Sequence, residues 1–543
     1  MTKRNNLLLL IPLILSLGLV GGIFLGKIFY GGSISKEEEK LRTILSIIQN
    51  EYVDDVSVDS LFNQTYFELA SALDPHSVYI PASELDVVND ELEGSFSGVG
   101  VSFQIMNDTV NVIEIVAGGP AEKVGILPGD KIVMVDTINI TGSNATNENV
   151  FKYLRGKKGT SVELKLKRSN SPKLLTFKVT RDDVPQNSVD AQYMMSDGVG
   201  YIKVSKFART TYEEFYKALQ ALQAQGAEKF IIDLRGNSGG YMEQAILMAN
   251  EFLPKDKMIV YTKGKNKKNE SFAISNGNGH FLDSEIVVVT DEFSASASEI
   301  FSGAIQDNDR GLVIGRRTFG KGLVQNQFPL PDNSALRLTV ARYFTPSGRS
   351  IQKEYTLGGS DKYALDLSER YAHGEFYNVD SIKMDKSKIF TTSTGRTVYG
   401  GGGIMPDIFV PEDTVGMTSY YISVANAGLI QQYAYDLAQK MRQQNGKIGT
   451  INEFLNKLPD NQTLLENFVD FASAKGVPAR WYYIRQSENL ILRQLKAITA
   501  RDLLGYSQYI QLLNKEDKTI GEALDALKSG KSPLIITNSN PKK

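Results

Sequence analysis

Residues 285–300 read EIVVVTDEFSASASEI, and this stretch predicts a buried strand followed at once by a helix. Residues 286–289 are apolar and β-branched, as a strand inside a parallel sheet requires. A serine at the following junction lies beside the positive end of the helix, where free backbone N–H groups can stabilise an oxyanion. Ser294, Ser296 and Ser298 are therefore candidate nucleophiles, although a hydroxyl in this place often only caps the helix.

The same alternation continues on the N-terminal side of this stretch. Strand-like runs at 200–204 and 229–234 each precede a segment with helical features, at 212–225 and after Gly240. Strands that alternate with helices form a buried, mostly parallel sheet. We therefore predict an α/β core within 183–415, in a multidomain chain of α/β and α+β class.

A serine nucleophile needs a base, and the chain has only three histidines. Lys321 is the local alternative, in the stretch 318–325 that reads TFGKGLVQ. Lysine can serve only where burial lowers its pKa far below about 10.4, and apolar neighbours such as Phe319 could supply that burial. Gln325 can bond a neutral amine without adding a carboxylate charge. The alternative is a solvated lysine, since most lysines lie on the surface.

Taken together, SASASEI at 294–300 and TFGKGLVQ at 318–325 closely resemble the carboxyl-terminal processing, or tail-specific, serine proteases. The resemblance extends over nearly the whole chain, through LDPHS at 73–77, DLRGNSGG at 233–240 and YGGGGI at 399–404. Any one of these motifs would be weak, whereas their combination is highly specific.

The resemblance implies a Ser/Lys dyad assisted by a glutamine. The implied nucleophile, general base and orienting partner are, in that order, Ser296, Lys321 and Gln325. The implied oxyanion hole consists of the backbone N–H of Ala297 and that of Gly239 or Gly240. Asp307 matches a further acidic position of the family, and we interpret it as structural support, because a carboxylate beside the lysine would favour the protonated amine.

Residues 86–182 are predicted to form a PDZ domain, because short β-rich runs alternate with Gly/Pro turns and GPAEKVGILPGDKI at 119–132 resembles the signature of that family. The loop that would bind a peptide carboxylate is Gly98, Val99, Gly100 and Val101. A generic glycine turn between strands is the alternative. Arg155 matches a family position that could couple peptide binding to the core, or it is an exposed turn arginine.

The N-terminal segment 1–34 contains an uncharged, largely apolar stretch, 5–26, that is long enough to cross a bilayer as a helix. Lys3 and Arg4 favour a cytoplasmic N-terminus. A cleaved signal peptide is the alternative, but the first alanine of the chain is Ala70, so no A-x-A cleavage site is present. We expect a retained anchor, with the protease in the periplasm or cell envelope.

Two further regions show apolar residues at helical spacing. They are predicted as a helical region at 35–85 and a helical domain at 416–543. The charged insert at 355–397 departs from a compact core and is expected to form an exposed loop or an oligomer contact. Together with the tendency of the family, these regions lead us to expect a homodimer.

Composition excludes several other classes of function. The chain has 60 Lys and Arg against 62 Asp and Glu, so no basic surplus indicates nucleic-acid binding. It has no cysteine, which excludes a thiol nucleophile, disulfides and Cys-ligated zinc. Residues 315–321 match the first part of a P-loop, but Gly322 replaces the hydroxyl that binds Mg²⁺. We expect neither a metal nor a nucleotide cofactor.

These features predict an extracytoplasmic serine endopeptidase. Its PDZ domain would recognise the C-terminal segments of unfolded or precursor proteins, and cleavage would proceed through an acyl-enzyme. One alternative is a non-catalytic scaffold that binds peptides through the PDZ domain. Another is an enzyme held inactive until a peptide moves the PDZ domain away from the site.

Overall fold

The computed structural model describes residues 35–530 except 170 and 197. The predicted anchor at 5–26 lies outside these residues. Within the described part, no helix combines the length and the apolar character needed to cross a membrane. The chain divides into two compact units, Met1–Ala70 and Ser71–Lys543.

The described part of the first unit contains α2 (Lys36–Glu51) and nearly all of α3 (Val58–Ser71). The Ser35 hydroxyl caps α2 by accepting the N–H of Glu38 at 3.2 Å. No residue of α2 is buried, and its apolar side chains Leu41, Ile44 and Ile47 are 41%, 44% and 56% exposed. Within the part of the chain that the structure describes, this helix therefore has an apolar stripe that remains exposed.

A six-stranded sheet forms the centre of the second unit, with the order β10-β11-β12-β15-β16-β21. Its strands are β10 (Val189–Met194), β11 (Val199–Val204), β12 (Lys229–Asp233), β15 (Glu285–Thr290), β16 (Leu312–Gly315) and β21 (Ile408–Phe409). Every neighbouring pair is parallel except the β10–β11 pair at the edge. The predicted α/β core is thus confirmed, and the strand read from the opening stretch lies inside its sheet.

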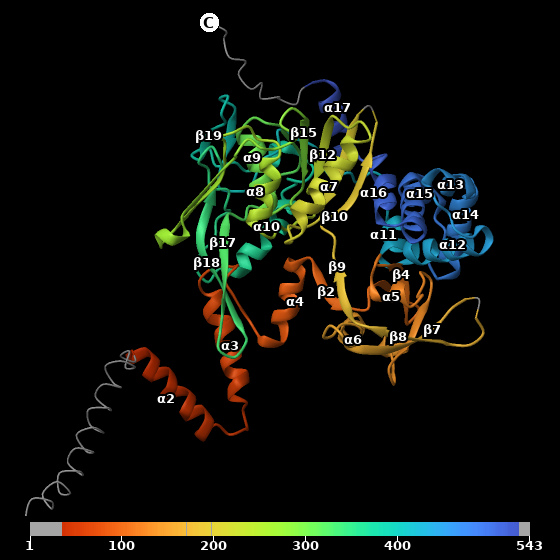
Figure 1. The fold of residues 1–543 in the computed structure, drawn as a ribbon, viewed down its shortest axis with the longest axis horizontal. Helices are drawn as coiled ribbons and strands as arrows, with labels where there is room; N and C mark the ends of the chain where they lie inside the picture. The colour runs from red at the N-terminus through yellow and green to blue at the C-terminus, as the bar shows by residue number, and fades with distance from the viewer. Residues whose placement is uncertain (1–34, 170, 197, 531–543) are drawn as a thin grey trace, which may run out of the picture. The chain divides into compact units, whose positions relative to one another are not determined.

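Helices cover both faces of this sheet (Figure 1). Ile286 and Val288 of β15 face the layer made of α7 (Thr211–Gln223), α8 (Met242–Asn250) and α9 (Ala297–Asp307). Val287 and Val289 face α17 (Lys518–Lys528), which comes from the end of the described chain. Successive residues of a strand point to opposite faces, so a strand covered on both sides is apolar throughout.

A second sheet carries the segment that follows Lys321. Its order is β1-β18-β13-β14, with β17 also paired to β18. The strands are β1 (Val78–Ile80), β13 (Met258–Gly264), β14 (Ser271–Ile274), β17 (Leu323–Pro329) and β18 (Ala335–Phe344). The register of β17 shifts between Val324 and Gln325, which re-aims the side chains there. Since β1 pairs with β18, the LDPHS motif at 73–77 lies close to this sheet.

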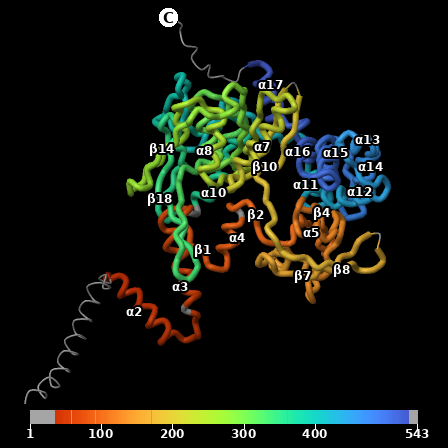
Figure 2. Tube along the Cα trace, viewed as in Figure 1, coloured from red at the N-terminus to blue at the C-terminus, as the bar shows by residue number. Residues whose placement is uncertain are grey.

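The PDZ domain is an inserted module after α4 (Ala82–Glu93). Its sheet and helices are β3 (Val101–Met106), β4 (Thr109–Ile115), α5 (Pro120–Lys123), β5 (Lys131–Val135), β6 (Ile138–Asn139), α6 (Asn147–Leu154), β7 (Ser161–Lys167) and β8 (Leu175–Thr180). The chain enters through β2 (Ser95–Gly98) and leaves through β9 (Asp182–Pro185), and these two strands pair antiparallel (Figure 2).

The helical region near the C-terminus has its own apolar core. It contains α11 (Ser419–Asn426), α12 (Leu429–Asn445), α13 (Ile451–Lys457), α14 (Asn461–Ala474), α15 (Trp481–Leu504) and α16 (Tyr506–Asn514). The PDZ domain contacts α12, where the Tyr435 hydroxyl donates to Asn111 Oδ1 at 3.2 Å. The predicted boundary at 416 does not separate this region fully from the core, since α17 packs on the sheet of the core.

The insert at 355–397 is more ordered than the exposed loop that its charge predicts. It contains α10 (Ser360–Ala372) and β19 (Ile389–Thr391), which pairs with β20 (Thr397–Tyr399). Arg370 of α10 is buried and donates to the carbonyls of Arg317 and Thr318, at 2.8 and 3.1 Å. Its charge therefore stabilises the core instead of facing water.

Candidate active site

Ser296 lies at the turn between β15 and α9, at the carboxyl end of a parallel strand. Its backbone has φ +56° and ψ −113°, a conformation that costs on the order of 1–3 kcal/mol for a residue with a side chain. The neighbouring serines are committed elsewhere: Ser294 Oγ donates to Leu234 O at 2.9 Å, and Ser298 Oγ donates to Asn237 O at 2.9 Å. Of the three candidates, Ser296 alone combines a strained backbone with a side chain that is only half-buried.

Two buried side chains hold this turn. The Glu299 carboxylate accepts the N–H of Ser296 at 2.9 Å, and the Tyr343 hydroxyl donates to the carbonyl of Ser296 at 3.1 Å. The same two side chains bind the lysine of the second motif: Glu299 accepts the N–H of Lys321 at 2.8 Å, and the single hydroxyl hydrogen of Tyr343 is shared between the Ser296 and Lys321 carbonyls. Glu299 and Tyr343 therefore clamp the backbones of Ser296 and Lys321 to each other.

Lys321 lies in a mostly buried environment. Burial lowers the pKa of its ammonium group, and the positive charge of Arg337 lowers it further. The negative charges of Glu299 and Asp74 act in the opposite direction. The net effect is a lowered pKa of Lys321. A lysine base requires this direction, because a larger share of the amine is then neutral.

Glu299 itself is fully buried, and burial raises the pKa of its carboxyl to about 7. The hydrogen bonds from Thr318, Lys321, Ser296 and Gly320 act against this increase. Sequence reasoning missed the role of this residue, although Ser296 and Glu299 have the S-x-x-E spacing in which a glutamate reaches back to the start of its helix.

The Gly239–Gly240 turn lies directly against Ser296. A Cβ atom on Gly239, whose φ is +103°, would fall 2.7 Å from Ser296 Cβ and 3.0 Å from the Ala297 nitrogen. The Gly239 N–H already donates to Asn237 Oδ1 at 2.8 Å. Among the described residues, the N–H groups of Ala297 and Gly240 have no acceptor. The turn thus offers these two donors to a developing oxyanion.

Among the described residues, the hydrogen bond of the Gln325 amide nitrogen goes to Thr339 and not to the lysine. Gln325 Nε2 donates to Thr339 Oγ1 at 3.1 Å, and the Thr339 hydroxyl donates to Asp74 Oδ1 at 3.0 Å. The structure therefore joins Gln325 to the LDPHS motif, a connection that sequence reasoning did not find. His76 of that motif bonds the Tyr363 hydroxyl at 2.9 Å, and burial, with Lys321 nearby, lowers the pKa of His76 to about 4.

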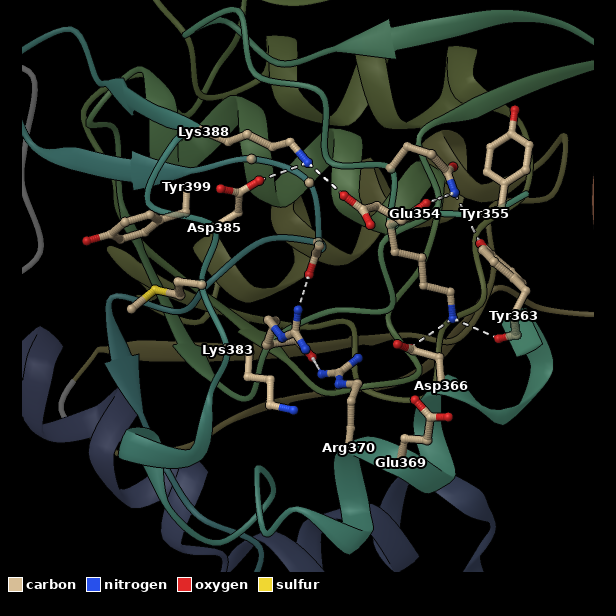
Figure 3. Close-up of a pocket in the computed structure, with 18 of the residues that line it drawn as sticks. Glu354, Tyr355, Tyr363, Asp366, Glu369, Arg370, Lys383, Asp385, Lys388 and Tyr399 are labelled. Atoms are coloured by element: carbon tan, nitrogen blue, oxygen red, sulfur yellow. Dashed lines mark hydrogen bonds and ion pairs between the residues drawn. The ribbon is translucent and has the colours of Figure 1, made fainter. Parts of the chain in front are cut away.

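A cavity of about 950 Å³ is lined mostly by residues of the insert at 355–397 (Figure 3). Tyr363, Asp366 and Arg370 line it from α10. The ammonium of Lys353 lies 3.9 Å from the ring centre of Phe319 and forms an ion pair with Asp366 at 2.9 Å. The insert thus supports the segment that carries Lys321, through charges that are paired with one another.

Asp307 at the end of α9 has the structural role that we expected. It forms an ion pair with Arg349 at 2.7 Å, and neither side chain is exposed. It also accepts the Ser347 hydroxyl at 2.7 Å. The pair connects the helix of the serine to the chain that follows β18.

The P-loop interpretation is not supported by the arrangement of residues 315–322. In a P-loop the backbone N–H groups surround a phosphate. Here the N–H groups of Gly320 and Lys321 donate to the carboxylate of Glu299, at 2.8 Å each. A negative side chain thus occupies the position that a phosphate would need.

The predicted peptide-binding loop, 98–101, lies between β2 and β3 and packs beside α5. Gly100 has φ +79°, and the Val99 carbonyl accepts the N–H of Ala121 at 2.8 Å, which holds the loop against α5. Arg155 is not an exposed turn residue. Its guanidinium lies 4.7 Å from the ring centre of Phe96 in β2 and 4.9 Å from that of Phe151 in α6.

Comparison with known families assigns three parts of the chain. A family model described as peptidase family S41 matches residues 198–359, and one described as PDZ domain matches residues 97–180. Residues 420–505 match a model described as a family of unknown function, DUF8443.

Several curated proteins are similar over most of their length. The carboxy-terminal processing protease CtpB of Bacillus subtilis is 32% identical over 355 residues, which are 64% of this chain and 72% of that protein. A carboxy-terminal-processing protease of Bartonella bacilliformis is 34% identical over 322 residues, 58% of this chain and 73% of that protein. Among solved structures, the photosystem II D1 C-terminal processing protease is 29% identical, with a TM-score of 0.33, over 60% of this chain and 86% of that one.

Proposed function

The chain belongs to the carboxy-terminal processing proteases of peptidase family S41, and from this premise we propose that Ser296 and Lys321 cleave peptide bonds through an acyl-enzyme. It is a serine-type peptidase that uses a PDZ domain in substrate recognition. The residues that perform the chemistry are the proposal. The observation that supports it best is the clamp, in which Glu299 and Tyr343 bind the backbones of both Ser296 and Lys321.

The first half of the reaction forms the acyl-enzyme. Neutral Lys321 Nζ takes the hydroxyl proton of Ser296 while Oγ attacks the carbonyl carbon of the peptide. The carbonyl electron pair moves to oxygen, which the N–H groups of Ala297 and Gly240 stabilise. The lysinium then protonates the leaving amine as the C–N bond breaks. Water hydrolyses the ester in the second half, with Lys321 as the base again.

The proposal is tested by the pH dependence of cleavage, measured with the full-length chain and an unfolded protein that has a free apolar C-terminus. Ser296→Ala and Lys321→Ala are each expected to abolish turnover. Ser294→Ala and Ser298→Ala are matched controls that should cleave, although with reduced stability. The rate of the unaltered chain should rise with pH as the lysine loses its proton. Turnover that persists in Ser296→Ala or Lys321→Ala would exclude the dyad.

We further propose that the PDZ domain presents the C-terminal segment of an unfolded or precursor protein to this site. The loop Gly98, Val99, Gly100 and Val101 would bind the terminal carboxylate, and the adjoining β3 would pair with the peptide. A peptide amide should bind more weakly than the matching free acid. A scaffold without activity would bind the peptide and leave it intact, whereas an enzyme held inactive would be activated by it.

The cellular location of the enzyme is a separate part of the proposal. The apolar stretch 5–26 supports a membrane anchor, and the charges before it support a protease outside the cytoplasm, in the periplasm or cell envelope. Protease added to intact cells with a permeabilised outer barrier should degrade the region after the anchor. Protection of that region would contradict this location.

A further inference from the structure

We propose that Asp74 is a positioning residue for the dyad: through the Thr339 hydroxyl it orients the Gln325 amide so that the carbonyl oxygen Oε1 faces Lys321. This inference rests on the proposed function. The residues come from three separate places in the chain, the turn after α3, β18 and β17.

The first step is the direction of the bonds around Asp74. The carboxylate is buried and accepts the N–H groups of His76 and Ser77, at 2.9 and 3.0 Å, and the Ser77 hydroxyl at 2.6 Å. Its fourth donor is the Thr339 hydroxyl at 3.0 Å. A carboxylate only accepts, so the Thr339 hydrogen is committed to Asp74.

The second step follows at Thr339. With its hydrogen used, Thr339 Oγ1 can only accept, and the donor that it faces is Gln325 Nε2 at 3.1 Å. An amide has its NH₂ group and its carbonyl oxygen on opposite sides. Fixing Nε2 on Thr339 therefore turns Oε1 of Gln325 away from Thr339. The register shift in β17 between Val324 and Gln325 re-aims the side chain at this point.

The third step concerns which face of Gln325 the lysine meets. Asp74 lies near enough to Lys321 for its negative charge to raise the pKa of the lysine, and Lys321 in turn lowers the pKa of His76. The hydrogen-bonded relay from Asp74 through Thr339 to Gln325 also ends beside the base in the fold, because Gln325 pairs with Thr339 and β17 begins two residues after Lys321. A carbonyl oxygen can accept a hydrogen bond from Nζ in either protonation state, whereas an NH₂ group would repel the lysinium.

The charged groups that face Lys321 have defined roles in this arrangement. Arg337 from β18 opposes protonation, while Glu299 from α9 and Asp74 favour it. His76 is neutral near pH 7, because its pKa is lowered to about 4. Gln325 adds a hydrogen-bond acceptor for Lys321 without adding a charge. The bonds from Asp74 through Thr339 determine that the carbonyl oxygen, and not the NH₂ group, faces the lysine.

The test compares Thr339→Val with Thr339→Ser in the full-length chain. Valine keeps the shape but removes the hydroxyl, while serine keeps the hydroxyl. We expect Thr339→Val to lower kcat by about tenfold to a hundredfold, as misplacement of a catalytic group does, and Thr339→Ser to stay near the original rate. The melting temperatures of both variants are measured beside the rates.

The pH profile separates orientation from mere stability. A carbonyl acceptor favours the lysinium over the amine, so its loss in Thr339→Val should move the rising limb to lower pH while kcat falls. Neither variant changes a charge, so the shift of the pH profile cannot come from altered interactions between charged groups. Asp74→Asn should shift the limb in the same direction, through both the relay and the lost charge.

The outcomes are distinct. An unchanged rate and profile in Thr339→Val would overturn the relay while the dyad stands, provided that Lys321→Ala is inactive. A lower rate with an unshifted limb, or equal impairment of Thr339→Ser, would also overturn it in favour of a structural role. If Lys321→Ala remains active, the dyad and the relay fail together.

Discussion

At the level of single residues, the four hydrogen bonds on the buried carboxylate of Glu299 hold the backbones of the proposed dyad in place. Three come from backbone N–H groups of Ser296, Gly320 and Lys321, and one from the Thr318 hydroxyl. A glutamine offers one carbonyl oxygen and an NH₂ group to the same donors, so some of them lose their acceptor. We expect Glu299→Gln to lower kcat at least tenfold, by about the free energy of one such bond.

The stability of this variant should depend on pH in a defined direction. Burial raises the pKa of Glu299 from 4.5 to about 7 in the folded chain. A raised pKa contributes stability that is present below pH 4.5 and is lost as pH rises through about 7. The loss is about 3 kcal/mol for this group. Glutamine does not titrate, so the original chain should lose its advantage in melting temperature between pH 5 and pH 8.

Glu369→Gln is the matched control, because Glu369 is exposed on α10. Its melting temperature should follow that of the original chain at every pH. A difference between Glu299→Gln and the original chain that stays constant with pH would show that Glu299 does not titrate in this range.

Gly239 is a second residue whose substitution has a clear expected effect. A Cβ there would lie 2.7 Å from Ser296 Cβ and from the carbonyl oxygen of Ala295, at φ +103°. Gly239→Ala should therefore displace the serine and reduce kcat about a hundredfold. Gly236→Ala is the control, since its φ is also positive, at +71°, but no atom lies within 4 Å of the added Cβ. Comparable kinetic losses in both variants would contradict a specific clash with the serine.

Sequence reasoning could propose the dyad but not the groups that hold its backbone. Ser296 and Lys321 stand in short local motifs, and Glu299 has a recognisable spacing from Ser296. Asp74 could not be connected to the site in this way, because its partner Thr339 is 265 positions away and the contact exists only once β1 pairs with β18. Hydrogen-bond direction around an amide is likewise a property of the folded site.

At the scale of elements, local periodicity predicted which segments are strands and helices, but not every surface on which they pack. The β15–α9 junction follows directly from the sequence, because each element is apolar in its own period. The spacing of apolar residues in α17 predicts an amphipathic helix, but this spacing is the same whether the apolar face packs on other helices or on a sheet. Only the tertiary structure shows it on Val287 and Val289.

The position of α17 predicts a large stability effect from the end of the chain. Ile520 is completely buried against the sheet, whereas Ile422 in α11 is 49% exposed. Ile520→Ala should destabilise the core by about 2–5 kcal/mol, and Ile422→Ala by much less. Thermal unfolding monitored together with loss of peptidase activity is the measurement. Equal effects of the two substitutions would show that α17 does not support the core in solution.

At the scale of the whole molecule, the PDZ domain has two connections within the second unit. The paired strands β2 and β9 join it to the core, and α12 contacts it through Tyr435 and Asn111. Arg155 stacks on Phe96 of β2, and this contact links the peptide-binding domain directly to the strands that connect it to the core. The PDZ domain therefore has contacts with both the core and the helical domain, and a change in the position of either can alter how it is held.

The exposed stripe on α2 leads to the last prediction, which concerns oligomeric state. Leu41, Ile44 and Ile47 lie on a helix without a buried residue, and a second copy of the same helix would cover them in a symmetric dimer. Burying one such side chain on each copy stabilises the dimer by about 1.5–3 kcal/mol per copy, so Ile44→Lys should weaken association about a hundredfold or more. Ser46→Lys adds the same charge on the opposite face of the helix, where the side chain is also exposed, and should leave association intact. Sedimentation in detergent distinguishes the cases: a chain that is monomeric at micromolar concentration before any substitution would rule out this dimer.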